Sequence, residues 1–223
     1  MLENVKFEAV IWDMDGLILD TERLAHESWQ QCSREFELGV DDSLFLEIIG
    51  MNVESFHRWL SERLHASVDV TALVQRANDI YQAKIAAGPP LKRGAKESIE
   101  WLAKRAIPQA VATSSSQNLA QRKLGHHDLL PHFGTISSGD QVSQGKPHPE
   151  IFVKAARDLG KQPERCLIFE DSRLGVMGAA ASGATVILVP DMAVHDNESR
   201  DLAHEIWDSL EIGPERFASW FSH

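Results

Sequence analysis

The part of the chain after residue 94 alternates short apolar runs with helical patterns, and this alternation constrains the fold more than any other feature. The apolar runs occupy residues 110–112, 134–137, 166–169 and 185–189. The helical patterns lie near residues 95–104, 149–159 and 174–181. Because strands that alternate with helices usually form βαβ units, the sequence predicts an α/β fold with a Rossmann-like, doubly wound parallel sheet.

A separate strand-like run, residues 7–12, lies far upstream. It has no βαβ partner close by, so we expect it to join the same sheet. The amphipathic stretches between the two regions occupy residues 26–36, 53–64 and 72–85. They predict an all-helical domain, residues 19–90, inserted into a core domain of residues 1–18 and 91–223. The last residues, 198–223, are expected to form one or two surface helices that carry Trp207 and Trp220.

Composition and charge narrow the range of partners. The chain has 223 residues, of which 43% are hydrophobic, enough for one substantial core and a smaller second domain. Its 22 basic and 33 acidic residues give a formal net charge of −11, which repels nucleic-acid phosphates and anionic lipids. A small anionic substrate is compatible, because a metal ion and a few cationic side chains reverse the potential inside one cleft. We expect a small-molecule partner, no nucleic acid, no membrane, and a monomer or weak homodimer.

The two cysteines, Cys32 and Cys166, lie far apart and have no metal-ligand spacing. They predict neither a zinc site nor a disulfide framework. Residues 1–7 show no basic segment followed by a long apolar run, and no stretch approaches the roughly 20 apolar residues that a membrane span needs. These features are typical of the reducing cytoplasm, which is the expected location.

Two carboxylates, Asp13 and Asp15, directly follow the first strand-like run in the segment Asp13-Met14-Asp15-Gly16. Open parallel sheets place their ligands at the carboxyl ends of strands. Taken alone, the two acids could equally be polar residues that close a strand. The ends of the other predicted strands decide between these interpretations.

Further polar groups follow the later strand-like runs. Thr113 and Ser114 offer hydroxyls and backbone N–H groups for phosphate oxygens, Lys146 lies in a loop stiffened by prolines, and Glu170 and Asp171 end another run. Each motif alone is common without function, because hydroxyls cap helices, loop lysines are solvated and acids favour helix N-termini. Together, at one edge of one sheet, they complete a set for phosphoryl transfer, with carboxylates for Mg²⁺ and a lysine and hydroxyl for the phosphate charge.

These four segments resemble the four motifs of the haloacid dehalogenase superfamily, in order and spacing and over nearly the whole chain. The segments are Asp13-x-Asp15-Gly16, Thr113/Ser114, Lys146-Pro147 and Glu170-Asp171-Ser172. The helical insertion resembles the cap of the beta-phosphoglucomutase-like subgroup. Residues 13–22 and 112–115 are most similar to the branch of pseudouridine-5′-phosphatases and related sugar-phosphate phosphatases.

The resemblance implies a magnesium-dependent phosphatase that works through an aspartyl-phosphate intermediate. Asp13 would attack phosphorus, and Asp15 would protonate the leaving oxygen and then deprotonate the hydrolytic water. The Mg²⁺ ion would be held by the Asp13 carboxylate, the Asp15 backbone carbonyl and Asp171. Glu170 would be a further ligand or would act through water.

The resemblance also assigns the groups that would bind the substrate. Lys146 would bind the phosphoryl oxygens together with Thr113, or with Ser114 if the loop is aligned one residue later. Contacts from the cap are expected from Glu22, Asn52 and Arg76. The alternative is that Arg76 belongs to a solvated helix face and Asn52 is a polar loop residue. The expected substrate is a sugar phosphate or a nucleotide monophosphate.

Two other functions stay open at this point. A phosphomutase of the beta-phosphoglucomutase type has a similar cap, but Gly50-Met51-Asn52 lacks the arginine expected after the cap glycine. Ala25 stands where the hinge histidine of such a mutase would fall, although His26 is one residue away. A receiver-like phospho-acceptor domain also combines acids, a hydroxyl and a lysine, but it has neither the Asp-x-Asp pair nor a helical insertion. The phosphatase is therefore the preferred prediction.

Overall fold

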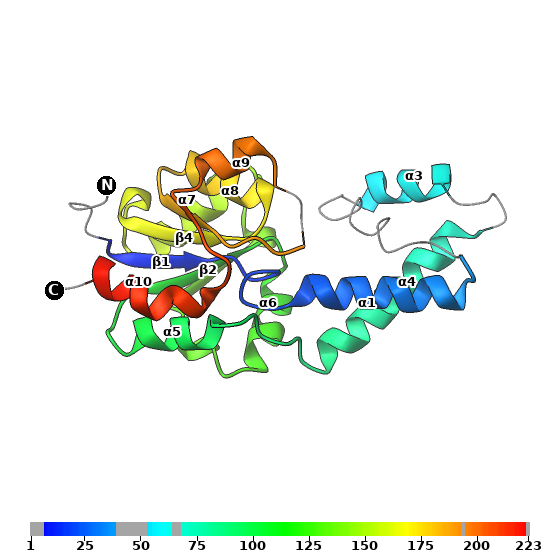
Figure 1. Cartoon of the computed structure of the whole chain (residues 1–223), viewed down its shortest axis with the longest axis horizontal. Helices are drawn as coiled ribbons and strands as arrows, with labels where there is room; N and C mark the ends of the chain where they lie inside the picture. Colours follow the sequence, from blue (N-terminus) through cyan, green and yellow to red (C-terminus); the bar gives the residue numbers. More distant parts are fainter. Residues whose placement is uncertain (1–6, 39–52, 64–67, 193–194, 222–223) are drawn as a thin grey trace. The chain divides into compact units, whose positions relative to one another are not determined.

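The structure, a computed structural model, describes residues 7–38, 53–63, 68–192 and 195–221, with the backbone alone for residues 53–57. The chain divides into two compact units (Figure 1). The first unit contains Met1–Asp20, Pro90–Asp191 and His195–His223, and the second contains Thr21–Pro89 and Met192–Val194. The second unit is thus inserted in sequence into the first.

The first unit is built on a parallel sheet, which has six strands in the described part of the chain, in the order β3-β2-β1-β4-β5-β6. The strands are β1 (Ala9–Trp12), β2 (Gln109–Thr113), β3 (Thr135–Ser138), β4 (Cys166–Glu170), β5 (Thr185–Leu188) and β6 (Glu205–Ile206). Ile11 of β1 lies opposite Ala110 on one side and Ile168 on the other. The predicted fold class is confirmed, and the strand order reverses next to β1, where such sheets bind ligands.

The central strands are buried on both faces, which explains their continuous apolar sequences. Every residue of β1, β2 and β4 is buried. The helices α5 (Ala95–Ala103), α6 (Gln117–Gly125) and α10 (Gly213–Trp220) pack on one face. The helices α7 (Glu150–Asp158) and α8 (Arg173–Ala181) pack on the other (Figure 1). The first face carries an aromatic layer, in which Trp12 stacks on Phe169 with ring centroids 4.6 Å apart.

The C-terminal region differs from the prediction of surface helices alone. Helix α9 (Asn197–Leu202) is followed by the edge strand β6 and then by α10. Trp207 follows β6, is only 2% exposed and stacks on Trp220 with ring centroids 5.6 Å apart. The expected surface position of Trp207 is therefore wrong. A strand of two residues shows no periodicity, and the charged residues Glu205 and Asp208 on either side of Ile206 and Trp207 give no sign of burial.

The remaining regular elements of the first unit are single turns of 3₁₀ helix. They are Leu130–His132, Gly139–Gln141, Pro163–Arg165 and Leu210–Ile212. The carbonyl of Leu210 accepts a 2.7 Å hydrogen bond from the buried Ser98 hydroxyl of α5. This contact joins the C-terminal segment to the helix layer.

Three helices form the described part of the second unit: α1 (Thr21–Glu35), α3 (Val53–Arg63) and α4 (Val70–Ala86). Its described residues contain no strand. Buried side chains of α1 and α4 pack together, and they include Trp29, Cys32, Leu73 and Ile80. The Asp69 carboxylate accepts a 3.0 Å hydrogen bond from the Ala72 N–H and caps α4. The second unit therefore has a hydrophobic core of its own.

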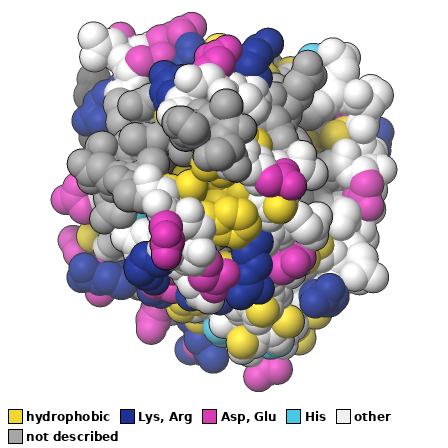
Figure 2. All heavy atoms as spheres, turned by 90° about the vertical axis from the view of Figure 1, so that its right-hand side faces the viewer, with side chains coloured by type: hydrophobic (Ala, Val, Ile, Leu, Met, Phe, Trp, Pro, Cys, Tyr) yellow, Lys and Arg dark blue, Asp and Glu magenta, His cyan; other side chains and the backbone are white. Residues whose placement is uncertain are grey.

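Charges of both signs lie on the molecular surface, and both cysteines are buried. Acidic and basic side chains are interspersed on the face that Figure 2 shows, and no large area of that face is basic alone. Cys32 and Cys166 are both buried as free thiols. Among the helices that the structure describes, none is long and apolar enough to cross a membrane.

Candidate active site

The turn after β1 places Asp13 and Asp15 at the carboxyl edge of the sheet. The N–H of Asp13 donates a 2.9 Å hydrogen bond to the Phe169 carbonyl of β4, and the Asp13 side chain is buried. The chain then turns at Gly16, whose φ is +88°, a conformation that favours glycine. A Cβ atom at Gly16 would lie 2.1 Å from Oδ2 of Asp171, so only a glycine lets that carboxylate approach.

The turn after β4 holds two fully buried carboxylates, Glu170 and Asp171. Oε2 of Glu170 accepts hydrogen bonds from the N–H groups of Asp171 (3.1 Å) and Ser172 (3.2 Å) and from the Ser172 hydroxyl (3.0 Å). These donors belong to the N-terminal end of α8, where a negative charge is favoured. A Cβ atom at Gly175 would lie 2.0 Å from the Glu170 carboxylate, so this glycine also makes room for an acid.

Lys146 brings a buried positive charge to these carboxylates. Its ammonium donates to Oδ1 of Asp13, to Oε1 of Glu170 at 2.5 Å and to the carbonyl of Ala112 at 3.2 Å. It also lies 5.1 Å from the ring centroid of Phe152 on α7. Lys146 is thus fixed by a strand, a turn and a helix, and it contacts two acids from different strand ends.

Burial and neighbouring charges shift the pKa values of Asp13 and Lys146. Burial raises the pKa of Asp13 to about 8, against the opposing effect of Lys146 and with a further rise from Glu170. Burial lowers the pKa of Lys146, but Asp13 and Glu170 raise it more, so it lies above its ordinary value. Two buried carboxylates share the Lys146 ammonium, and a cation bound beside them would stabilise their ionised forms.

Asp13, Glu170 and Asp171 fit a metal ion. Each offers one oxygen, and these three atoms lie within 4.8 Å of one another. The donor set consists of oxygen atoms, which Mg²⁺ prefers. The two glycines that admit the carboxylates, Gly16 and Gly175, show that the turns are shaped around these oxygens. The fourth predicted metal residue, Asp15, was expected to bind through its backbone carbonyl, and its carboxylate contacts Lys123 and Ser115.

The Asp15 carboxylate lies beside two residues that the sequence prediction did not select. Oδ1 accepts a 2.6 Å hydrogen bond from the ammonium of Lys123, and Oδ2 accepts one of 2.8 Å from the Ser115 hydroxyl. Ser115 belongs to the segment 112–115, whose resemblance to a branch of the family the sequence analysis noted. Lys123 had a signal as well, because it is a charged residue three positions after Ala120 on the buried face of α6.

The two candidate phosphate-binding hydroxyls lie at the end of β2 with different exposure. Thr113 is buried, and its Oγ1 accepts a 3.1 Å hydrogen bond from the Ser115 N–H. Ser114 is exposed. The Asp140 carboxylate accepts a 3.0 Å hydrogen bond from the Gln117 N–H and so fixes the first turn of α6. Because β2 runs parallel to β1, both hydroxyls lie at the same sheet edge as Asp13 and Lys146.

The predicted cap residues belong to the second unit or lie outside the described residues. Arg76 of α4 is paired with Glu35 of α1 through contacts of 2.7 and 3.0 Å, and its side chain is 45% exposed. Hydrogen bonding to Arg76 lowers the pKa of Glu35 to about 2. Glu22 lies in the first turn of α1 and accepts a 3.3 Å hydrogen bond from the Met192 N–H. Asn52 is outside the described residues.

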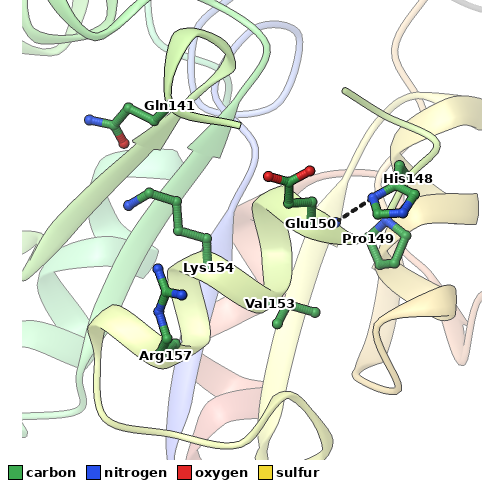
Figure 3. Close-up of a pocket in the computed structure, with 7 residues that line it drawn as sticks. All are labelled: Gln141, His148, Pro149, Glu150, Val153, Lys154 and Arg157. Carbon is green, nitrogen blue, oxygen red and sulfur yellow. Dashed lines mark hydrogen bonds between the residues drawn. The ribbon is translucent and has the colours of Figure 1, made fainter. Parts of the chain in front are cut away.

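A separate hollow beside α7 contains none of the strand-end carboxylates. It has a volume of about 370 Å³ and is lined by Gln141, His148, Pro149, Glu150, Val153, Lys154 and Arg157 (Figure 3). Its polar groups already have partners, since Lys154 pairs with Asp158 at 2.5 Å and Nδ1 of His148 accepts from the Glu150 N–H at 3.3 Å. The hollow therefore lacks the carboxylates that the predicted chemistry requires, and these lie at the sheet edge.

The fold and the site together define a class, that of α/β proteins with carboxylates and a buried lysine at the carboxyl edge of a parallel sheet. The family model of haloacid dehalogenase-like hydrolases matches residues 10–189, and the chain belongs to this family. It is 31% identical over 180 residues to a phosphorylated carbohydrates phosphatase of Thermotoga maritima, a match that covers 79% of this chain and 82% of that protein. The resemblance predicted from the four motifs is confirmed.

Two further comparisons agree. The chain is 31% identical over 215 residues to a Drosophila melanogaster protein named "probable pseudouridine-5′-phosphatase", covering 93% of this chain and 92% of that protein. The crystal structure of a haloacid dehalogenase family hydrolase from Deinococcus radiodurans, which contains bound phosphate and sodium, has a TM-score of 0.85 and 26% identity. That match covers 97% of each chain. The chain is thus an enzyme of a hydrolase family whose matched relatives include phosphatases by name.

Proposed function

We propose that this enzyme hydrolyses the phosphate monoester of a small metabolite with Mg²⁺ as cofactor and Asp13 as nucleophile. The observation that carries the proposal is the contact of Lys146 with both Asp13 and Glu170, beside Asp171 and next to the reversal of strand order. Such a group combines an activated carboxylate with positive charge for phosphoryl oxygens. The metal, when bound, would neutralise charge on the carboxylates and on the transferring phosphoryl group.

In the first step, a carboxylate oxygen of Asp13 attacks phosphorus. The ester P–O bond breaks, the departing oxygen takes a proton from Asp15, and the alcohol is released. Lys146 stabilises the negative charge of the phosphoryl oxygens, and Thr113 or Ser114 orients them. The product of this step is an aspartyl-phosphate at Asp13, with Asp15 left as a carboxylate.

In the second step, a water molecule attacks the phosphorus of the aspartyl-phosphate. It gives a proton to the Asp15 carboxylate, and the bond between phosphorus and the Asp13 oxygen breaks. Inorganic phosphate leaves, Asp13 is again a carboxylate and Asp15 again carries a proton. The two acids therefore return to their starting states after one turnover.

The proposed substrate class is supported by the names of two relatives. A sugar phosphate is supported by the Thermotoga maritima relative, and a nucleotide monophosphate by the Drosophila melanogaster relative. We propose that residues 19–90 act as the cap that excludes water and contacts the non-phosphate part of the substrate. Glu22, Asn52 and Arg76 remain the proposed contacts.

The test is phosphate release from a panel of phosphorylated metabolites, with Mg²⁺ and with chelator, for the wild type and Asp13→Asn. We expect metal-dependent release that disappears in the variant. Asp158→Asn on α7 is a matched control, because it makes the same chemical change away from the sheet edge. Release that persists in Asp13→Asn would overturn the nucleophile assignment. Interconversion of phosphate isomers without release would replace the phosphatase with a phosphomutase.

A further inference from the structure

Lys123 is a buried charge that the mechanism above does not use. Its side chain is only 3% exposed, and its neighbours on α6, Ala120 and Leu124, belong to the hydrophobic core. A buried ammonium group is unfavourable unless it is paired and hydrogen-bonded. Its contact with Oδ1 of Asp15 at 2.6 Å provides that partner, and Oγ of Ser115 lies at 3.5 Å.

The two contacts of the Asp15 carboxylate restrict its rotation, because they engage different oxygens. Lys123 donates to one oxygen and the Ser115 hydroxyl to the other. Ser115 is itself held in place, since its N–H donates to Oγ1 of Thr113 at 3.1 Å and its carbonyl accepts from the Gly139 N–H at 3.0 Å. The position of Asp15 is therefore set by β2, its loop and α6, as well as by its own turn.

Stability does not account for this arrangement. A buried ion pair contributes little net stability, and apolar residues of the same size often serve equally well. The pair is also asymmetric, because the Lys123 side chain is 3% exposed whereas that of Asp15 is 30% exposed. The lysine is enclosed and the carboxyl stays accessible, which is what a group that exchanges protons with a substrate requires.

We infer that Lys123, together with Ser115, is a positioning residue that holds the Asp15 carboxyl where it meets the leaving oxygen of a phosphate ester. Lys123 does not touch the substrate in this role and acts through Asp15. The inference rests on the proposed function, because it gives Asp15 the proton transfer. It adds a requirement to that function: loss of Lys123 should impair departure of the alcohol more than attack on phosphorus.

The test compares esters whose leaving groups differ in their need for a proton. The measured quantity is kcat/KM, which reports the steps up to release of the alcohol, for the best alkyl phosphate of the panel and for p-nitrophenyl phosphate. A nitrophenolate leaves without protonation, whereas an alkoxide does not. Since general acid catalysis contributes roughly 100- to 10,000-fold, Lys123→Met should lower kcat/KM about 30-fold or more for the alkyl ester and less than about threefold for the aryl ester.

A double variant separates action through Asp15 from a structural role. If Lys123 acts through this carboxyl, adding Lys123→Met to Asp15→Asn should reduce kcat/KM by no more than about twofold. A structural defect would instead reduce the activity by the same factor in both backgrounds. Lys154→Met is the matched control, because it removes a lysine that pairs with Asp158 on α7, away from the sheet edge.

Each outcome decides the question. Equal losses for the two esters, or a full further loss in the Asp15→Asn background, would overturn the inference and leave the phosphatase in place. A wild type that hydrolyses neither ester would overturn the proposed function and the inference with it. If Lys123→Met does not fold, Ser115→Ala takes its place, and a loss that is the same for both esters would overturn the inference.

Discussion

Two lysine–carboxylate pairs lie at the same sheet edge and differ in the groups that surround them. Lys146 contacts the buried carboxylates of Asp13 and Glu170, and an oxygen of the buried Asp171 lies within 4.8 Å of an oxygen of each. Lys123 contacts one oxygen of Asp15, and the Ser115 hydroxyl donates to the other. Two acids that are separated by one residue therefore receive different tasks. In the proposed mechanism, the first place would hold a metal ion and the nucleophile, whereas the second would hold the proton-transfer group.

The largest expected effect separates the two acids by the step that each performs. Asp13→Asn should lose turnover by a factor on the order of 10⁵ and form no phosphoenzyme, because the nucleophile is absent. Asp15→Asn should still react with p-nitrophenyl phosphate and should accumulate the aspartyl-phosphate, because the base for the water is absent. Acid quenching followed by intact mass spectrometry measures the adduct. A phosphate adduct on Asp13→Asn would contradict the comparison.

Loss of the first lysine should affect all substrates alike. Lys146→Met removes positive charge next to the phosphoryl group, and we expect kcat/KM to fall about 100- to 1,000-fold for alkyl and aryl esters. Steady-state kinetics with both esters measures this, with Lys154→Met as the control. A loss that appears with alkyl esters alone would show that Lys146 assists the leaving group, and the distinction between the two lysines would fail.

The raised pKa of Asp13 predicts that the affinity of the site for Mg²⁺ depends on pH. The pKa of Asp13 without a metal is about 8, so Mg²⁺ has to displace a proton below that pH. Between pH 6 and 8, the association constant should therefore increase about tenfold per pH unit. Calorimetry in two buffers with different ionisation enthalpies measures the released proton. In Asp13→Asn, the association constant should depend less on pH. An affinity independent of pH in the wild type would show that Mg²⁺ displaces no proton from Asp13.

The smallest effect concerns stability at the second lysine. Lys123→Met should change the free energy of unfolding by less than about 1 kcal/mol, because a buried ion pair adds little and the exposed side of Asp15 stays solvated. Urea unfolding of the wild type and the variant measures the change. Destabilisation of about 3 kcal/mol or more would make Lys123 a structural residue and would remove the contrast with Lys146.

The positions of the polar groups at the strand ends could be predicted from the sequence because buried parallel strands are continuous apolar runs. The predicted runs at residues 110–112 and 166–169 differ from β2 and β4 by one or two residues, and the acids of the second run stand at its end as expected. Parallel pairing then brings all carboxyl ends to one edge. The proximity of Asp13, Lys146 and Glu170 at this edge was accordingly expected, and the structure brings the three side chains into contact.

Other features depend on tertiary packing that no local pattern encodes. The contact of Lys123 with Asp15 joins residues 108 positions apart, and only the packing of α6 on the sheet decides that its ammonium points to the turn after β1. Ser115 could not be told apart from Thr113 and Ser114 by residue type alone. The burial of Trp207 depends on a two-residue edge strand, for which periodicity carries no information.

Gly16 and Gly175 give the site an uneven sensitivity to mutation. A Cβ atom at Gly16 would lie 2.1 Å from the Asp171 carboxylate, and a Cβ atom at Gly175 would lie 2.0 Å from the Glu170 carboxylate. Both distances are too short for a non-bonded contact. An alanine at either position would therefore displace the carboxylate of Asp171 or Glu170, with an effect on the site similar to removal of that carboxylate. Two positions without any functional group are thus as intolerant of change as the acids they admit.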